Sequence, residues 1–451
     1  MSDAINLSLE DRGVQVSELE TSAKAAPRLR SAFGWTFAGN VIYALASWSM
    51  LSAVTKLSTG AAVGQYALGI SIVGPIFVFA TLQLRTVHVT DARSEFSFAD
   101  YFTLRCLGIA AAFLAVVAIV ILGHYDWNTS AIILLVGAAK AIECLGEGTA
   151  GLMQKVERLD QAARSLILRG AVSVPTFALV LFVSRQVALA AGAVAVAWII
   201  VLLFYDFRIA RELLQGERFS SSSLRKLWRL LGVSLPLGIV VGIVALNGNL
   251  PRYVVQHYLG PTQLGIFVSL AYLISAINLI VYALGQSVSV RLARMFAAGD
   301  LAGFIHILRR LVFLGVFFGV IAVPSANLLG KPVLRLLYRP EYALYSNLLP
   351  IMAVVAGITA VGLFLDFGMT AARCFRAQVP VIAGATVAGF LVSAVLVPAY
   401  GLQGAAFGLL AAAAVFAAGN AAVLTAAIRY ARYAKFLRAS SAQSSLSSIE
   451  G

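Results

Sequence analysis

Residues 187–205 have the sequence VALAAGAVAVAWIIVLLFY, a run of nineteen residues without a charged side chain. A helix needs about 20 apolar residues to cross a hydrocarbon core about 30 Å thick. The run therefore predicts a membrane-spanning helix. The rest of the chain has the same character, since 60% of its 451 residues are hydrophobic and 12% are charged. A water-soluble fold of this composition would expose more apolar surface than monomers tolerate.

Apolar runs of similar length fill most of the chain and predict an all-α, polytopic membrane protein. We place twelve spans at 33–55, 65–84, 104–122, 131–153, 166–184, 187–205, 230–250, 263–288, 307–330, 349–371, 379–398 and 403–428. The chain then divides into a polar tail at 1–32, a six-helix lobe at 33–205, a linker at 206–229, a second six-helix lobe at 230–428 and a polar tail at 429–451.

The positions of the basic residues predict how the chain is oriented. The net charge is +14, and most Lys and Arg lie in the two tails and in every second loop. Because positive loops stay on the cytoplasmic side, we expect both termini in the cytoplasm. No nucleic-acid partner is expected, because the charge is spread over short loops and forms no single basic face.

The linker and the last tail carry expectations of their own. After the serines at 220–223, apolar residues stand at 224, 227, 228 and 231 with basic residues between them. This pattern predicts either a helix lying on the anionic inner leaflet or an extended start of the seventh span. The serine-rich segment 440–445 predicts a partly disordered tail.

Charged side chains inside the predicted spans indicate function, because each costs about 2.5–3.5 kcal/mol on insertion scales and normally faces protein or water. The fourth span contains Lys140, Glu143 and Glu147, whose spacing places them on one stripe of a helix. The stripe predicts a water-filled path between the lobes. The alternative is a Lys140–Glu143 pair that only fixes helix packing.

Two further polar groups lie at membrane depth or at the end of a span. Asp366 is in the tenth span, with Arg373 at its cytoplasmic edge, and could carry a coupling proton or cation or pair with a basic residue. Asn247, Asn249 and Arg252 form a helix-weakening cluster in the seventh span. This cluster could bind a cation or a sugar, or it could be only the outer end of the helix.

Arginines close several spans at the predicted inner face. Arg85 ends the second span, and Arg291 and Arg294 end the eighth. A guanidinium group forms bidentate hydrogen bonds to phosphate oxygens, so these arginines are suited to bind a lipid-linked pyrophosphate. Ordinary positive-inside residues have the same appearance in a sequence, and that alternative stays open.

Several classes of site are not expected. The sequence has no Walker GxxxxGK[ST] loop, and Cys106, Cys144 and Cys374 are too far apart for a CxxC-type ligand set. We therefore expect no cofactor, no metal site and no catalytic residue. The predicted outer loops have about 20 residues or fewer, which leaves no room for the large outer loop expected of a lipid-linked sugar polymerase or ligase.

The two halves share a short motif. VGQYA at 63–67 begins the second span, and LGIFV at 264–268 begins the eighth. An offset of about 200 residues also carries the first span onto the seventh. Six spans per half preserve orientation, so these halves would be parallel repeats about an axis along the membrane normal, a plan found among transporters.

Several motifs resemble the polysaccharide transporter family, which comprises the O-antigen and exopolysaccharide flippases of Wzx type within the MOP exporter superfamily. The resembling segments are VGQYAL at 63–68, LQLR at 82–85, GLMQKVER at 151–158, NLPRY at 249–253, LGIF at 264–267, AGD at 298–300, EYA at 341–343 and PAYGLQGAA at 398–406. The resemblance covers nearly the whole membrane region.

This resemblance implies two six-helix bundles in a V around a cavity that opens alternately to each side. It implies an undecaprenyl-pyrophosphate-linked oligosaccharide as the substrate, moved across a bacterial inner membrane without covalent chemistry. The expected partners are this substrate, membrane lipids, a polysaccharide polymerase and a chain-length regulator. The alternatives within the superfamily are an exporter of cationic drugs of MATE type and a lipid II flippase.

Overall fold

The computed structural model describes residues 29–91, 94–214 and 223–447, and every regular element within these ranges is a helix. The first half contains α2 (Leu29–Leu57), α3 (Gly60–Ala80), α4 (Leu84–Thr90), α5 (Phe98–Leu122), α6 (Trp127–Lys155), α7 (Leu159–Ser184), α8 (Val187–Val201), the π-helix η1 (Leu202–Asp206) and α9 (Phe207–Leu213). The second half contains α10 (Leu224–Asn247), α11 (Leu250–Ala297), α12 (Leu301–Leu337), the 3₁₀ turn η2 (Pro340–Tyr345), α13 (Leu348–Ala371), α14 (Phe375–Tyr400) and α15 (Leu402–Ser447). The all-α prediction is confirmed.

The predicted spans need one correction, at the junction of the seventh and the eighth. The sequence predicts a loop at 251–262, whereas α11 is already helical from Leu250 onward. Pro251 permits this, because a proline in the first turn of a helix costs no hydrogen bond. α11 bends at Gly260, whose φ is 80°, a value that glycine adopts easily and other residues rarely adopt. Of the described helices, eleven stretches are long and apolar enough to span a membrane, and one of them, Leu224–Leu273, joins the seventh span to the start of the eighth.

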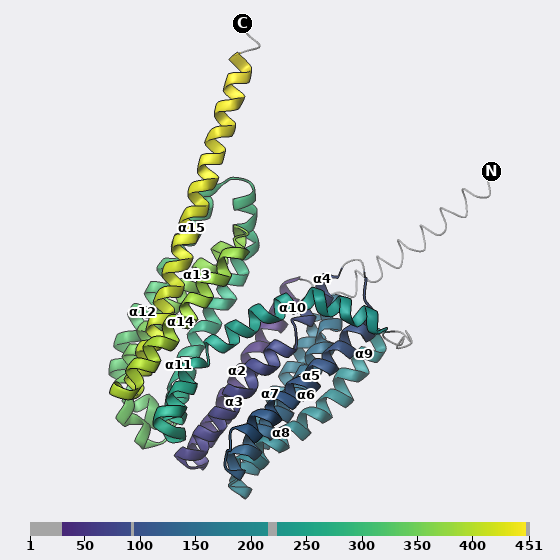
Figure 1. Ribbon diagram of the computed structural model, residues 1–451, viewed down its shortest axis with the longest axis vertical. Coiled ribbons are helices and arrows are strands. Elements are labelled where there is room, and N and C mark those ends of the chain that lie inside the picture. The colour runs from purple at the N-terminus through teal and green to yellow at the C-terminus, as the bar shows by residue number, and fades with distance from the viewer. Residues whose placement is uncertain (1–28, 92–93, 215–222, 448–451) are drawn as a thin grey trace, which may run out of the picture.

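The helices form two bundles that lie side by side (Figure 1). We call α2 to α9 the first lobe and α11 to α15 the second lobe. α10 begins at Leu224 and continues without a break to Asn247, so the segment after the serines is the extended start of the seventh span. Residues 215–222 of the predicted linker and most of the predicted first tail lie outside the described residues.

The last helix extends into the predicted tail, and the partial disorder of that tail stays a prediction. α15 runs from Leu402 to Ser447 and passes through the serine-rich segment (Figure 1). Alanine, leucine, arginine and lysine dominate the residues just before that segment and have high helix propensity, so the helix carries on beyond the lobe.

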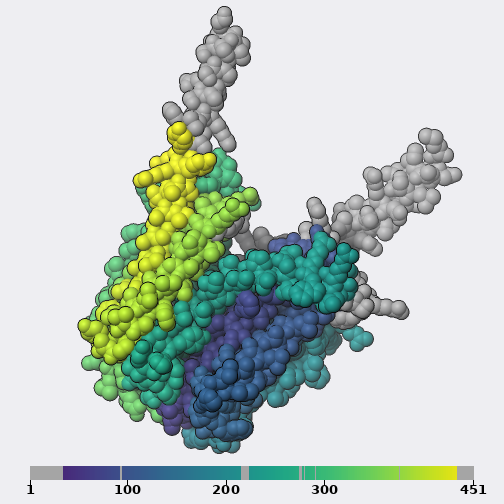
Figure 2. Space-filling model, viewed as in Figure 1, coloured from purple at the N-terminus to yellow at the C-terminus, as the bar shows by residue number. Residues whose placement is uncertain are grey.

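The first part of α10 is attached to the first lobe. Gly238 and Gly242 of α10 lie directly against Phe79 and Leu82 at the end of α3. Arg229 Nη2 is 2.7 Å from the Glu95 carboxylate in the loop before α5. α10 also contacts α14 of the second lobe, so it lies against both lobes; Figure 2 shows the teal α10 and α11 between the blue first lobe and the green and yellow second lobe.

Asp91 follows α4 and binds the described residues around the start of α5. Its carboxylate accepts hydrogen bonds from the backbone N–H groups of Glu95 and Phe96 and from the Tyr101 hydroxyl, at 3.1 to 3.2 Å. Slight burial by itself raises the pKa of Asp91, but these hydrogen bonds to the charged form outweigh it and hold the pKa below its usual range.

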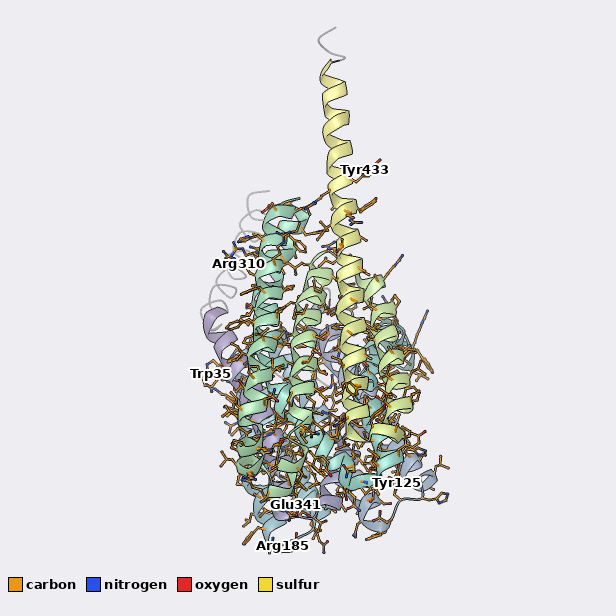
Figure 3. All side chains as sticks on the ribbon, turned by 90° about the vertical axis from the view of Figure 1, so that its left-hand side faces the viewer. Trp35, Tyr125, Arg185, Arg310, Glu341 and Tyr433 are labelled. Carbon is orange, nitrogen blue, oxygen red and sulfur yellow. The ribbon has the colours of Figure 1, made fainter. Side chains whose placement is uncertain are left out.

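The two ends of the molecule differ in their residues. Figure 3 shows Tyr125, Arg185 and Glu341 at one end and Arg310 and Tyr433 at the other. We call these the Arg185 end and the Arg310 end. Tyr125, Arg185 and Glu341 lie in predicted outer loops, whereas Arg310 lies close to a basic loop and Tyr433 lies in the described part of the last tail.

The two lobes are bonded to each other at the Arg185 end. The Trp48 indole N–H donates to the Tyr338 hydroxyl at 3.1 Å, and the Ser52 hydroxyl donates to the Leu337 carbonyl at 2.8 Å. Both bonds connect α2 to the last turn of α12 or the residue after it. The lobes are therefore held together across this end of the molecule.

The sequence motif that the two halves share also lies where the two lobes touch. A Cβ atom on Gly64 of α3 would lie 1.7 Å from the Pro261 carbonyl oxygen on α11. A Cβ atom on Gly265, its counterpart in the second half, would lie 2.8 Å from the Gly64 nitrogen. The backbones of α3 and α11 thus pack directly against each other at these two glycines. Only glycine, which has no Cβ atom, allows the backbones to approach so closely.

Candidate functional site

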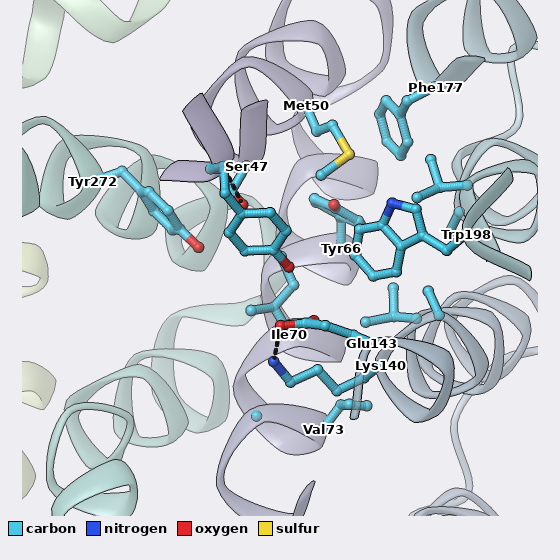
Figure 4. A pocket seen from close by; sticks show the side chains of 16 residues that line it. Ser47, Met50, Tyr66, Ile70, Val73, Lys140, Glu143, Phe177, Trp198 and Tyr272 are labelled. Atoms are coloured by element: carbon cyan, nitrogen blue, oxygen red, sulfur yellow. Dashed lines mark hydrogen bonds and ion pairs between the residues drawn. The ribbon is translucent and has the colours of Figure 1, made fainter. Parts of the chain in front are cut away.

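A cavity of about 230 Å³ lies inside the first lobe, next to the second (Figure 4). Its walls come from α2, α3, α6, α7 and α8, and Tyr272 of α11 lines the side that faces the second lobe. Because both lobes contribute to its lining, a relative movement of the lobes would change its shape and its access.

Lys140 and Glu143 of the predicted stripe both line this cavity. Lys140 Nζ lies 2.8 Å from Glu143 Oε1, and their side chains are 26% and 12% exposed. The Tyr43 hydroxyl also interacts with the Glu143 carboxylate. The Lys140–Glu143 pair within α6 is therefore formed, and both of its side chains also line the cavity.

Glu147, which lies one helical turn after Glu143 on α6, forms an ion pair with a residue of another helix. Its carboxylate is 3.4 Å from the guanidinium of Arg105, a side chain that is only 2% exposed. The same guanidinium donates to the Cys144 carbonyl at 2.8 Å. Arg105 thus ties α5 to α6, and the stripe is divided between the cavity and this interhelical contact.

The candidate arginines of the predicted inner face occupy different positions. Arg85 Nε donates to Gln154 Oε1 at 2.9 Å, which joins α4 to the last turn of α6. Arg373 follows the end of α13 with a φ of 58°, the left-handed conformation common after helix ends.

The cluster at the junction of α10 and α11 connects the two lobes at the Arg185 end. Asn249 donates to the Ala245 carbonyl at 2.8 Å and accepts from Arg252 at 3.1 Å. Arg252 also reaches the Ser71 hydroxyl of α3 at 3.4 Å. Asn247 is the last residue of α10 beside this cluster. None of these three residues lines the cavity.

Comparison with known proteins was made on sequence and on structure. No family model matches the chain. A capsular polysaccharide biosynthesis protein, CapF of Staphylococcus aureus, is 25% identical over 380 residues, which cover 83% of this chain and 93% of that protein. An inward-facing MATE multidrug resistance transporter of the MOP superfamily superposes with a TM-score of 0.63 at 13% identity, over 93% of this chain and 99% of that one. The Vibrio cholerae MATE transporter VcmN gives 0.62 at 13% identity, over 91% and 98%.

The chain shares its fold with these MATE transporters. Together with the capsular polysaccharide relative, this fold confirms the resemblance to polysaccharide transporters of that superfamily. The chain is thus a multi-pass membrane protein with two helical lobes.

In the second lobe, the Asp366 carboxylate of α13 accepts a hydrogen bond from a side-chain amide. Gln378 Nε2 on α14 lies 3.0 Å from Asp366 Oδ1 and 2.8 Å from Thr370 Oγ1. Among the described residues, no Lys, Arg or His lies within ion-pair distance of this carboxylate. The expected pairing with a basic residue is therefore not formed in the described chain.

The sequence reasoning missed one buried ion pair of the first lobe. Arg169 of α7 pairs with Asp206, and their side chains are 3% and 1% exposed. Asp206 is the last residue of the π-helix η1, and π-helical turns are frequent at functional sites. Arg169 also donates to the Glu143 carbonyl at 3.2 Å. The sequence contained a sign of this pair, because Arg169 is a charged residue inside the predicted span 166–184.

A glycine of α6 makes the room for this pair. A Cβ atom on Gly146 would lie 1.6 Å from Arg169 Nη2, so a larger residue there would displace the guanidinium. The ion pair therefore supports α6 close to Lys140 and Glu143, through the bond from Arg169 to the Glu143 carbonyl. Neither Arg169 nor Asp206 lines the cavity itself.

Proposed function

We propose that this protein is a flippase that moves an undecaprenyl-pyrophosphate-linked oligosaccharide across a bacterial inner membrane, for the synthesis of a surface polysaccharide. The observation that carries the proposal is the cavity bordered by both lobes, with the Lys140–Glu143 pair facing it, in a relative of a capsular polysaccharide biosynthesis protein. Transport proceeds by alternating access of the two lobes, without covalent chemistry.

The orientation follows from the basic residues. The Arg310 end and both termini lie in the cytoplasm, and the Arg185 end faces outward. The bonds between the lobes then close the outer side. Arg85, Arg291, Arg294 and Arg373 belong to the inner side, where guanidinium groups would receive the pyrophosphate of an arriving substrate. Moving negative charge outward across an inside-negative membrane gains about 2.3 kcal/mol per charge per 100 mV, so the potential favours export.

The charges of the cavity favour this function over export of cationic drugs. An exporter of cations needs a carboxylate that is free to attract its substrate. Here the Glu143 carboxylate already accepts from Lys140 at 2.8 Å, and the ammonium group would repel a second cation.

Replacement of Lys140 by methionine distinguishes these two functions. The Lys140→Met variant leaves Glu143 uncompensated, so we expect it to lose flipping of the lipid-linked oligosaccharide by at least about tenfold. The assay follows labelled undecaprenyl-pyrophosphate-oligosaccharide in proteoliposomes. Arg208→Ala, at an exposed surface pair, serves as the control and should flip normally. An exporter of cationic drugs would instead gain cation transport in Lys140→Met, and that result would overturn the proposal.

Asp366 is the position we propose for a coupling cation, since its bonded partner is a neutral amide. Asp366→Asn keeps an oxygen that can accept from Gln378 but removes the charge. We expect this variant to flip substrate at a rate that no longer responds to an imposed proton or sodium gradient. A gradient response equal to that of the wild type would remove Asp366 from this role.

A further inference from the structure

The cavity beside Lys140 is lined by aromatic rings from four helices of the first lobe. The Tyr43 and Trp198 ring centroids are 6.2 Å apart, and those of Tyr66 and Phe177 are 5.6 Å apart. All four rings line the cavity, and Tyr272 joins them from α11 (Figure 4). Rings packed in pairs keep their orientation, so the cavity presents fixed aromatic surface.

Trp198 lines the cavity with the small exposed part of its ring, 4% of the residue, and without a polar group. Its indole N–H donates to the Ser173 hydroxyl at 2.8 Å, and Ser173 is not part of the cavity lining. The hydroxyl of Ser173 donates in turn to the Arg169 carbonyl. The indole ring is therefore held from behind, and the side that it turns to the cavity can make only apolar and stacking contacts.

The polar groups of the cavity supply both donors and acceptors. An ammonium group has three N–H donors, and the Glu143 carboxylate takes one from Lys140. The carboxylate has two oxygens and accepts at several positions. A hydroxyl group both donates and accepts, so this pair matches the hydroxyls of a ligand.

Aromatic faces combined with a paired donor and acceptor fit a sugar ring, which has an apolar C–H face and an edge of hydroxyl groups. The ionisable pair of the lining, Lys140 and Glu143, has a net charge of zero. The volume of about 230 Å³ is below the roughly 300–1,000 Å³ of pockets for drug-sized ligands. The cavity thus suits one uncharged ring and is too small for a whole oligosaccharide.

We infer that this cavity is a subsite for a single uncharged sugar residue of the transported lipid-linked oligosaccharide, packed against the exposed part of Trp198 and against Tyr272 and hydrogen-bonded to Lys140 and Glu143. The inference rests on the proposed function. The remaining sugars extend from the cavity past Tyr272 between the lobes. Because Tyr272 belongs to the second lobe, the bound ring contacts both lobes and its affinity depends on their arrangement.

The test measures binding of short probes to the purified full-length protein. The probes are undecaprenyl pyrophosphate alone and the same lipid carrying one glucose, galactose, N-acetylglucosamine or glucuronic acid. We expect at least one of the three neutral sugars to raise the affinity about tenfold over the bare lipid, and glucuronic acid to raise it less.

Two variants should remove this gain. Trp198→Leu and Tyr272→Leu should bind the glycosylated and the bare lipid equally, whereas Trp198→Phe, which keeps a ring, should retain most of the gain. Trp228→Leu, at a tryptophan of α10 that is 66% exposed, is the matched control and should behave as the wild type. Tyr272 is half-buried, so its variant keeps the test valid should Trp198→Leu fail to fold.

The outcomes separate the inference from the proposed function. No gain from any neutral sugar in the wild type, or a full gain in Tyr272→Leu, would overturn the sugar subsite. Absence of flipping of any undecaprenyl-linked probe by the wild type in proteoliposomes would instead overturn the proposed function. Binding of tetraphenylphosphonium that is lost in Tyr272→Leu would identify a cation pocket and would also overturn the subsite.

Discussion

Replacement of Gly64 by alanine should abolish transport and leave the protein inserted in the membrane. The added Cβ atom would lie 1.7 Å from the Pro261 carbonyl oxygen and 2.2 Å from the Pro261 carbonyl carbon. Both are backbone atoms of α11, so no side-chain rotation relieves the overlap. The lobes must move apart at the Arg185 end, and the protein can then no longer reach the state in which this end is closed.

A cross-link between the lobes reports this change. The cross-link uses Ser52→Cys and Leu337→Cys, in a background from which Cys106, Cys144 and Cys374 have been removed. In the wild type these two residues are joined across the lobes, because the Ser52 hydroxyl donates to the Leu337 backbone carbonyl at 2.8 Å. A short bifunctional maleimide should join the pair efficiently in the parent protein. In the Gly64→Ala variant we expect the yield to fall several-fold, together with loss of flipping in proteoliposomes.

Gly69→Ala is the matched control. It makes the same change on the same helix, five residues away, and adds the same increment of helix propensity. Its Cβ atom would meet no neighbour closer than 3.5 Å, an ordinary contact. We expect normal cross-linking and normal transport. Equal cross-linking yields in Gly64→Ala and Gly69→Ala would contradict closure through this contact.

The helices themselves could be predicted because span length depends on apolar composition alone. The run 187–205 specifies a span without reference to any other residue. The bend at Gly260 and the helix at 250–260 could not, because a proline and a glycine are compatible with both a loop and the ends of two helices. The length of α15 could not be predicted either, because the serine content of 440–445 and the helix formers before it favour different structures.

The candidate site was predictable in its residue types and unpredictable in its partners. The spacing of Lys140 and Glu143 placed them on one face of α6, and both line the cavity. The same periodicity put Glu147 on that face, but an arginine on α5 binds it. Periodicity describes one helix only, whereas the neighbour that a charge meets depends on how helices from distant parts of the sequence pack. The aromatic lining was missed for the same reason, since its rings come from separate helices.

The buried pair of Arg169 and Asp206 gives the largest expected change in stability. Loss of either partner leaves the other charge unpaired in a dry interior, so Arg169→Met and Asp206→Leu should each lower the free energy of unfolding by about 3–5 kcal/mol. Unfolding of the purified protein in mixed micelles measures this. For the exposed pair of Arg208 and Glu212, with side chains 76% and 57% exposed, Arg208→Met should cost less than about 1 kcal/mol.

The double variant, Arg169→Met with Asp206→Leu, decides what the ion pair contributes. Arg169 Nε and Asp206 Oδ1 are buried without hydrogen-bond partners, so the pair is incompletely compensated for its loss of water. Two apolar side chains of similar volume should therefore restore most of the stability that each single variant loses. Transport should stay impaired, because the bond from Arg169 to the Glu143 carbonyl, which holds α6 behind the cavity, is gone. A stable double variant that flips substrate normally would show that the pair serves folding alone, whereas a double variant less stable than both single variants would contradict the electrostatic argument.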